Sequence, residues 1–152
     1  MRGHQPPSQS LEDEMYYDEL SVGDSASFEK TISETDVHGF AGISGDFNPA
    51  HVSQRYAETT RFGRRIAHGM LSGSLFSTVF GTKLPGAGAI YLSQSLNFLA
   101  PVFLGDTVTA TVTVTEKREK GRVAFACQAT NQDDVVVIQG EAVLLPPRRP
   151  QA

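Results

Sequence analysis

The fold of this chain is decided by residues 68–81, which read His-Gly-Met-Leu-Ser-Gly-Ser-Leu-Phe-Ser-Thr-Val-Phe-Gly. A surface helix shows a polar stripe, but apolar and small residues occur on nearly all sides of a helix built from this stretch. We therefore expect a long helix that is buried all round. Leu84-Pro85-Gly86 follows and ends it, because proline cannot continue a helix and glycine favours a turn.

The segments around this helix predict an antiparallel sheet. Strand patterns occupy the ranges 25–33, 89–98, 107–116, 123–130 and 135–145. Threonine alternates with valine or alanine over 107–114, a strong period-two pattern. Lys120-Gly121 and Asp133-Asp134 mark hairpin turns between the last strands.

Two shorter helices are predicted before the long one. The first runs for about ten residues from an N-cap at Ser33 or Thr35 to Ser44-Gly45, and the second covers 53–59. A single sheet buries a long apolar helix only by curling around it. The expected fold class is therefore α+β, an antiparallel sheet wrapped around a long central helix. One face of such a layer stays open, so we expect a homodimer.

Length and composition favour one domain. The chain has 152 residues and 39% hydrophobic composition, enough for a substantial core. The domain is expected over residues 16–146. Residues 1–15 are polar, contain Pro6-Pro7, and are interpreted as a flexible leader, while residues 147–152 form a tail.

Composition also limits the partners of this protein and the compartment in which it is found. A formal net charge of -4 argues against nucleic acid. Cys127 is the single cysteine, so an internal disulfide framework is impossible and a reducing compartment is indicated. No apolar stretch reaches the roughly 18 residues of a membrane span, and the N-terminus does not resemble a signal peptide. We expect a cytoplasmic protein that binds neither nucleic acid nor membrane.

A second stretch, Gly45-Asp46-Phe47-Asn48-Pro49-Ala50-His51, carries the chemistry. Its carboxylate and imidazole lie five residues apart around an Asn-Pro turn, and such a pair can transfer protons near neutral pH. The helix start at Gly69 offers backbone N–H groups to a developing negative charge. Together they suggest that water is added to, or removed from, a carbon next to a carbonyl group. The simpler alternative is an Asx turn in which Asp46 or Asn48 caps the next helix and His51 is merely exposed.

These residues resemble the D-x-N-P-x-H signature of the MaoC-like hydratase family, and Ala67-His68-Gly69-Met70 is similar to the start of that family's central helix. The stretches 93–98, 101–102 and 105–106 resemble the strand and turn that follow, and the likeness extends over residues 17–145. It is closest to the short (R)-specific enoyl-CoA hydratases. The resemblance implies the hot-dog fold and the reversible hydration of trans-2-enoyl-CoA to (R)-3-hydroxyacyl-CoA. Coenzyme A is then part of the substrate, and no separate cofactor is expected.

The resemblance also implies a role for each candidate residue. His51 is the general base that takes a proton from a water, and Asp46 holds and polarises that water. The backbone N–H of Gly69 is the oxyanion donor. Asn48 orients the loop, and Ser77 supports it through a hydrogen bond. The simpler interpretations are that Gly69 only permits tight packing and that the Ser77 hydroxyl bonds to its own helix.

The remaining candidates are basic, apolar and metal-ligating residues. Candidates for the coenzyme A phosphates are Arg61, Arg64 and Arg65, or alternatively Lys117, Arg118, Lys120 and Arg122 around a hairpin; a solvated turn is the simpler interpretation of each cluster. Residues that could line an acyl pocket are Phe47, Leu71, Phe76 and Phe80; the simpler interpretation is that the apolar residues of the helix belong to the core. The histidines are not at metal-ligand spacing, so no metal is expected, and His68 is expected to fix the loop.

Three other functions share these features. A dehydratase of acyl-carrier-protein thioesters would use the same acid–base pair but needs a basic docking surface. A hot-dog thioesterase would direct the activated water at the thioester carbon. A non-enzymatic acyl-CoA-binding subunit would require a broken acid–base pair, whereas here the pair is intact. Acyl-chain length and pathway stay open.

Overall fold

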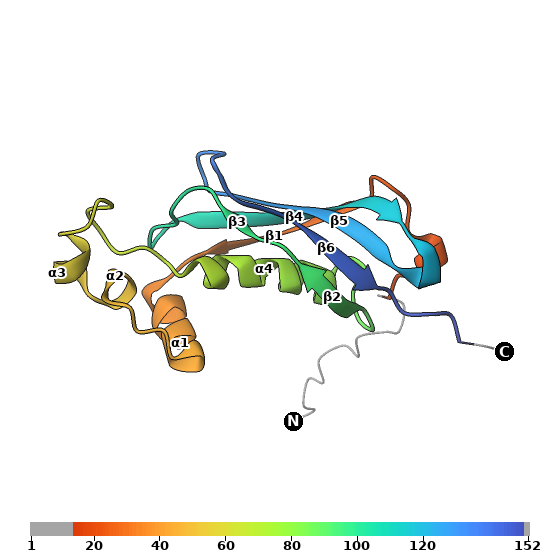
Figure 1. Ribbon diagram of the computed structural model, residues 1–152, viewed down its shortest axis with the longest axis horizontal. Helices are drawn as coiled ribbons and strands as arrows, with labels where there is room; N and C mark the ends of the chain where they lie inside the picture. Colours follow the sequence, from red (N-terminus) through yellow and green to blue (C-terminus); the bar gives the residue numbers. More distant parts are fainter. Residues whose placement is uncertain (1–13, 151–152) are drawn as a thin grey trace, which may run out of the picture.

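The computed structural model describes residues 14–150 (Figure 1). The helices are α1 (Glu34–Ser44), α2 (Pro49–Val52), α3 (Gln54–Ala57) and α4 (Gly69–Thr82). The strands are β1 (Ser25–Thr31), β2 (Ile90–Gln94), β3 (Asn97–Phe98), β4 (Thr107–Lys117), β5 (Val123–Thr130) and β6 (Val136–Leu145). The predicted α+β order, in which short helices and a long helix precede most of the strands, is confirmed.

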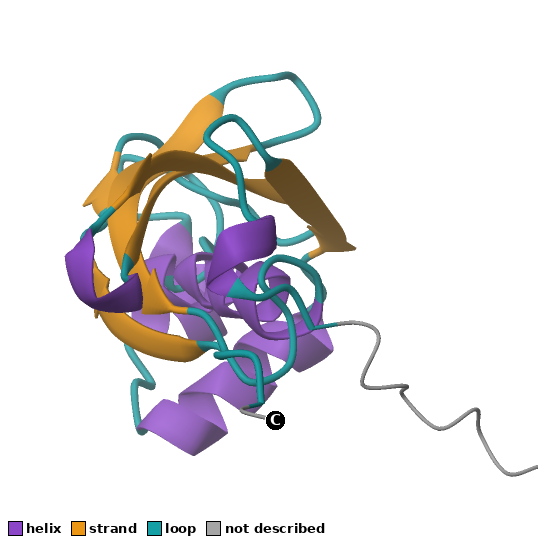
Figure 2. Ribbon diagram, turned by 90° about the vertical axis from the view of Figure 1, so that its right-hand side faces the viewer, coloured by secondary structure: helices purple, strands orange, loops and turns teal. Residues whose placement is uncertain are grey.

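All strands belong to one antiparallel sheet. The order is β1-β4-β5-β6-β2, and β3 pairs with β6 next to β2. Figure 1 shows α4 running along one face of this sheet, and the end-on view in Figure 2 shows the strands arching over the helices. The predicted architecture of a sheet wrapped around a long central helix is therefore confirmed.

The alternation in β4 places its branched and small residues in the core. The inward-facing positions are Val108, Ala110, Val112 and Val114, all buried. The threonines between them lie on the outer face, where their hydroxyls pair with β1: Ser27 and Thr111 oxygens are 2.8 Å apart, and those of Thr31 and Thr107 are 2.7 Å apart. Cross-strand hydroxyl pairs of this kind support the register of the sheet.

The long helix is buried on one side only. Its sheet-facing residues include Leu75, Phe76, Val79 and Phe80, all in the core. The opposite stripe, formed by Met70, Ser74, Ser77 and Gly81, is exposed. The prediction of a helix buried all round is therefore wrong for the single chain, because the sheet covers one side of α4 and leaves the other open.

The first helix forms as its caps predict. The Ser33 hydroxyl accepts from the Asp36 N–H (3.1 Å), and the Ser33 N–H donates to the Asp36 carboxylate (2.9 Å). This backbone hydrogen bond holds the pKa of Asp36 below its ordinary value. Gly45 ends the helix with φ 80°, a left-handed conformation that glycine adopts without strain. Ser33, not Thr35, is thus the N-cap.

Two predicted elements differ in extent. The helix expected over 53–59 is present in shortened form as α3, which Ser53 caps, and a second one-turn helix that was not predicted, α2, precedes it with Asn48 as its cap. The strand expected over 89–98 is interrupted between β2 and β3. At this break the Ser95 carbonyl crosses β6 so closely that a Cβ on Gly140 would lie 1.9 Å from it.

The predicted leader and tail are described only in part. The leader, residues 1–15, lies outside the described residues except for its last two, and Met15 donates its N–H to the Pro85 carbonyl (2.9 Å). In the tail, the Arg149 guanidinium pairs with the Asp18 carboxylate at 2.8 Å. Among residues 14–150, no helix has both the length and the apolar character needed to cross a lipid bilayer.

Candidate active site

His51 lies on a one-turn helix whose position is set by the residues before it. Asn48 Oδ1 accepts from the Ala50 N–H (3.0 Å), and Pro49 occupies the first helical position, which proline tolerates. His51 is 9% exposed, and its Nδ1 lies 2.7 Å from the Ile66 carbonyl oxygen. Because a carbonyl only accepts, Nδ1 must donate, which leaves the lone pair of a neutral ring on Nε2. Nε2 is therefore the atom that can take up a proton.

Asp46 faces this nitrogen. Its Oδ2 lies 4.0 Å from His51 Nε2, too far for a direct hydrogen bond but close enough for one water to contact both. Its Oδ1 accepts from the Asn48 N–H (3.1 Å), which forms an Asx turn. The simpler alternative is thus right about the turn and about Asn48 as a cap. It is wrong about His51, which is buried; the turn holds the carboxylate in front of the imidazole.

His68 connects the start of α4 to the loop that carries Asp46. Its Nε2 donates to the Asp46 carbonyl oxygen at 2.9 Å, so it fixes the loop as expected. Its ring is buried between two others, with centroids 3.9 Å from His51 and 4.8 Å from Phe40. The remaining nitrogen, Nδ1, has no hydrogen-bond partner among the described residues.

Gly69 lines the same cavity as His51. It is the first residue of α4, so its N–H has no acceptor within the helix. A cavity of about 430 Å³ opens here and is lined by both His51 and Gly69. A Cβ at this position would lie 2.7 Å from a ring carbon of Phe98, so only glycine lets that ring rest against the helix start. The structure thus places His51 and Gly69 on the wall of one cavity, with the Asp46 carboxylate 4.0 Å from His51 Nε2.

The rest of the cavity wall is mostly apolar. It includes Ile66, Phe98, Leu99, Val102 and Ile138. The four residues named as candidates for an acyl pocket do not contribute to it. Phe76 and Phe80 are in the core, as the simpler interpretation has it, Leu71 packs against the core, and Phe47 is exposed. Sequence periodicity identified these four residues as apolar but could not say which cavity they face. Much of the wall is formed by the segment between β3 and β4, which is distant in sequence from His51 and Gly69.

The serine that lines the cavity is Ser72, which the sequence did not single out. It is buried, and its Oγ has no hydrogen-bond partner among residues 14–150. Ser77 instead lies on the exposed side of α4, in a separate shallow hollow with Phe40 and Tyr91. Within one chain, therefore, the structure does not bring Ser77 to His51. Helical spacing could have identified Ser72, because residue 72 lies about one turn after Gly69 on the same face of the helix.

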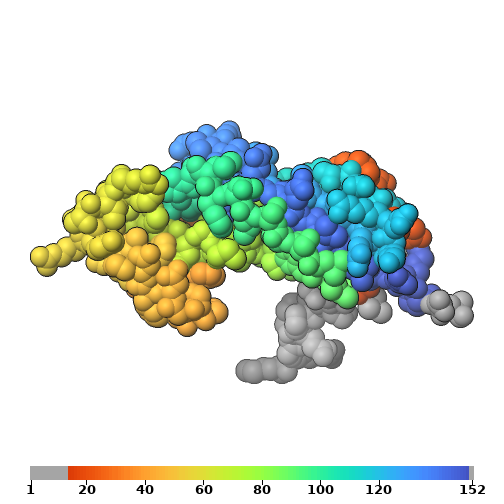
Figure 3. All heavy atoms as spheres, in the orientation of Figure 1, coloured from red at the N-terminus to blue at the C-terminus, as the bar shows by residue number. Residues whose placement is uncertain are grey.

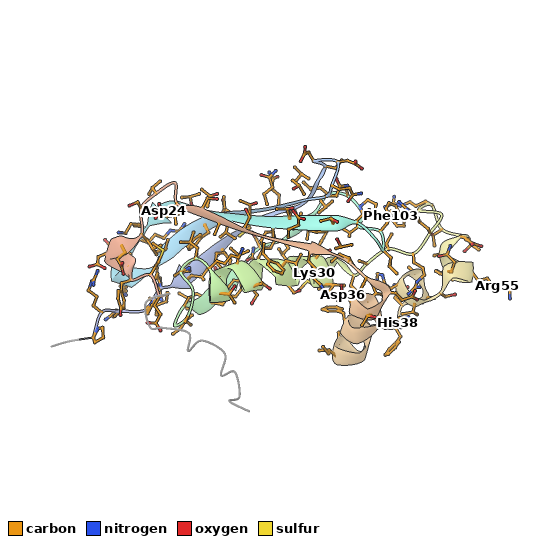
Figure 4. All side chains as sticks on the ribbon, turned by 180° about the vertical axis from the view of Figure 1, so that it is seen from behind. Asp24, Lys30, Asp36, His38, Arg55 and Phe103 are labelled. Atoms are coloured by element: carbon orange, nitrogen blue, oxygen red, sulfur yellow. The ribbon has the colours of Figure 1, made fainter. Side chains whose placement is uncertain are left out.

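The three candidate arginines have different environments. Arg61 lines the cavity. Arg64 stacks on the ring of Phe103, 3.8 Å from its centroid; Figure 4 labels Phe103 on the segment leading to β4. Arg65 points into the protein and bonds to the His51 carbonyl and to Glu34, which favours a structural role; its role as a coenzyme A contact stays a prediction. Figure 3 shows that the lobe formed by α1, α2 and α3 lies at one end of the molecule.

The alternative basic cluster lies elsewhere and is partly engaged. The Arg118 guanidinium pairs with Glu116 at 3.1 Å, and Lys117 lies 4.4 Å from the centroid of the Tyr17 ring. These residues flank the hairpin between β4 and β5, at the opposite end of the sheet from α2 and α3 (Figure 1). The geometry therefore favours Arg61 over this cluster as a contact for a ligand in the cavity.

Asp46, His51 and His68 also form the one group in residues 14–150 with the composition of a metal site. Their ligand atoms lie within 4.8 Å of one another. Lone pairs lie in the plane of an imidazole, and the rings of His51 and His68 are stacked with an interplanar angle of 31°, so their lone pairs do not converge on one point. This arrangement suits a water held by Asp46 and His51 better than a cation, and the absence of a metal stays a prediction.

Comparison with known proteins connects this site to a family. The MaoC like domain matches residues 20–135. An (R)-specific enoyl-CoA hydratase of Rhodospirillum rubrum is 56% identical over 135 residues, covering 88% of this chain and 93% of that protein. A 3-hydroxybutyryl-CoA dehydratase of Methylorubrum extorquens is 46% identical over 141 residues, covering 91% and 88%. Among solved structures, an unliganded R-hydratase from Pseudomonas aeruginosa is 46% identical with a TM-score of 0.86, covering 90% of this chain and 88% of that one.

Proposed function

Because the chain belongs to the MaoC-like domain family, as its signature motif predicted, we propose that it is an (R)-specific enoyl-CoA hydratase. It reversibly adds water to trans-2-enoyl-CoA and yields (R)-3-hydroxyacyl-CoA. The enzyme is a hydro-lyase that needs no cofactor, since coenzyme A is part of the substrate. The (R) configuration of the product is carried by the likeness to R-hydratases.

The geometry supports this reaction in the following way. A water held by Asp46 and His51 gives up a proton to His51 Nε2, the nitrogen whose lone pair is free. The oxygen of that water bonds to C3 of the enoyl thioester, and the negative charge moves to the thioester oxygen. The Gly69 N–H stabilises this oxygen at the helix start. A proton shared by the acid–base pair then returns to C2, so that the water supplies both the hydroxyl group and the hydrogen.

The observation that carries the proposal is the relation between the acid–base pair and the helix start. Asp46 Oδ2 and His51 Nε2 are 4.0 Å apart, and His51 and Gly69 line one apolar cavity. An enoyl chain fits such a wall, and its thioester oxygen meets a backbone donor. Arg61, on the same wall, is the proposed contact for a coenzyme A phosphate.

The proposal includes a homodimer in the cytoplasm. The open side of α4 and the edge strand β2 expose a continuous apolar surface that includes Met70, Tyr91 and Leu92. An unpaired edge strand next to an apolar patch is a ready surface for a second copy. Cys127, buried with its pKa raised to about 11 by burial, is the single cysteine and suits a reducing compartment.

The test is the loss of enoyl-thioester absorbance with crotonyl-CoA, followed by chiral analysis of the product. Rapid loss with formation of the (R)-3-hydroxy thioester supports the proposal. Formation of the (S) product contradicts the stereochemical part of it. Release of free coenzyme A identifies a thioesterase, whereas activity with acyl-carrier-protein thioesters alone identifies the carrier-protein dehydratase. Binding of the substrate without turnover identifies a non-enzymatic subunit.

A further inference from the structure

Arg65 is occupied on two sides inside the protein. Its side chain is 10% exposed. Its Nε donates to the carbonyl oxygen of His51 at 2.6 Å, and its Nη1 lies 2.6 Å from Glu34 Oε1. Both contacts use the planar fork of the guanidinium, which a lysine cannot reproduce. One arginine thus connects the N-terminal turn of α1 to the residue that acts as the base.

The neighbouring residue holds the imidazole itself. The Ile66 carbonyl accepts from His51 Nδ1 at 2.7 Å, and the Ile66 N–H donates to the Ala50 carbonyl at 3.2 Å. Arg65 and Ile66 therefore contact residues 50–51 at three points, which are the ring and two successive backbone carbonyls. We call this set of contacts the base clamp.

The α2 helix needs external support because it has only four residues. A helix this short is not stable alone, and the carbonyls of its last turn have no partner within it. The His51 carbonyl is one of these, and Arg65 supplies its donor. Glu34 holds the arginine from the other side, and the hydrogen bond from Arg65 lowers the pKa of the Glu34 carboxyl. Glu34 is itself largely exposed, so it orients the guanidinium and does not bury it.

We propose that Arg65 is a positioning residue for the general base, which sets the distance between the His51 imidazole and Asp46 without touching the substrate. This inference rests on the function proposed above. The two groups are 4.0 Å apart, so a small movement of α2 breaks their shared hold on one water. A misplacement of about 1 Å costs on the order of a hundredfold in rate.

The test is a comparison of kcat and KM in Arg65→Met and Arg65→Lys with crotonyl-CoA. In Arg65→Met, kcat is expected to fall by about tenfold to a hundredfold, with KM changed by less than about twofold. A raised KM with unchanged kcat would overturn the proposal, because that is the signature of a lost phosphate contact. Near-normal values for both constants would overturn it equally.

Arg149→Met is the matched control. Arg149 also pairs with a carboxylate, that of Asp18 at 2.8 Å, but it belongs to the segment after β6, which leaves the sheet at the end opposite α2 (Figure 1). Its replacement is expected to leave kcat at the wild-type value. If Arg65→Met does not fold, Arg65→Lys decides. A phosphate-binding role predicts near-normal kinetics for this charge-preserving change, whereas a positioning role predicts a lower kcat because the fork is lost.

Nitrogen-15 NMR of the histidine rings separates this proposal from the proposed function. In the wild type the proton on His51 Nδ1 is protected by its bond to Ile66. It is expected to exchange faster with solvent in Arg65→Lys and to be unchanged in Arg149→Met. If the wild type hydrates no enoyl thioester, the proposed function fails but this measurement still tests the base clamp. Unchanged exchange in Arg65→Lys would then refute it.

Discussion

At the scale of single residues, the chemistry depends on which atoms of a side chain are already engaged. The Nδ1 of His51 is hydrogen-bonded to the Ile66 carbonyl, and Oδ1 of Asp46 to the Asn48 N–H. The atoms that remain available, His51 Nε2 and Asp46 Oδ2, are 4.0 Å apart. An Asx turn and a catalytic carboxylate are usually alternative interpretations of one aspartate. Here they are compatible, because a carboxylate has two oxygens and the turn uses one.

The first prediction concerns the acid–base pair. Asp46→Asn and His51→Gln should each lower kcat by at least about a hundredfold, because each removes a group that transfers or holds the proton. The measurement is steady-state hydration of crotonyl-CoA, with circular dichroism to confirm folding. Asp133→Asn, which neutralises an exposed carboxylate in the turn between β5 and β6, is the control and should retain activity. Near-normal turnover in both site variants would refute the assigned roles.

A second prediction separates the two functions of Gly69. Gly69→Ala retains the N–H but places a Cβ 2.7 Å from the Phe98 ring, so activity should fall because the ring and the helix start are forced apart. Gly69→Ala combined with Phe98→Ala should recover much of the loss. Gly69→Pro should not recover in the same background, because proline has no N–H to stabilise the oxyanion. Equal activity of Gly69→Pro and wild type would exclude the backbone donor.

At the scale of elements, interruptions of regular structure form the site. The one-turn helix α2, which ends before α3 begins, holds His51, and the interruption between β2 and β3 brings Phe98 over Gly69. The interruption between β2 and β3 depends on a close crossing of two backbone segments. Ser95 donates its N–H to the Glu141 carbonyl at 2.8 Å while its own carbonyl passes over Gly140.

A third prediction follows for this crossing. Gly140→Ala should lower the free energy of unfolding by about 1–3 kcal/mol, because the new Cβ overlaps the Ser95 carbonyl and the backbone must shift. Thermal unfolding measures the effect. Gly39→Ala on α1, where a Cβ meets nothing within 4 Å, is the control and should raise stability by about 0.5–1 kcal/mol. If both variants unfolded at the same temperature, the crossing would not be tight.

At the scale of the whole molecule, the single chain leaves one side of its long helix α4 uncovered. The sheet covers one side of α4, and the other side exposes Met70 at 58% together with Tyr91 and Leu92 on β2. Figure 2 shows the strands arching over one side of the helices and leaving the other side uncovered. A second copy would cover this surface, and Ser77 lies within it.

A fourth prediction tests the proposed dimer. Light scattering should give the wild type a mass of twice the 16.4 kDa of one chain. Leu92→Lys should shift the protein toward the monomer, because it places a charge in an apolar contact. Val22→Lys changes an even more exposed apolar residue, in the turn before β1, and should leave the mass unchanged. A monomeric wild type would contradict the proposal directly.

The sequence by itself determined the family, the order of most elements and the acid–base loop. These features depend on local patterns, such as the period of two in β4, the capping box of Ser33 and Asp36, and the short spacing of Asp46 and His51. Each is encoded within a few neighbouring residues, so it can be interpreted without knowing what packs against it.

Only the tertiary structure decided which candidates share the site. Arg65 pairs with Glu34, which is 31 positions away, and His68 reaches the Asp46 carbonyl across 22 positions. The same holds for Ser72 facing the cavity while Ser77 faces outward, and for the open side of α4. The physical reason is that a hydrogen bond or a packed face between distant segments depends on how the sheet curls around α4. No local pattern encodes that arrangement.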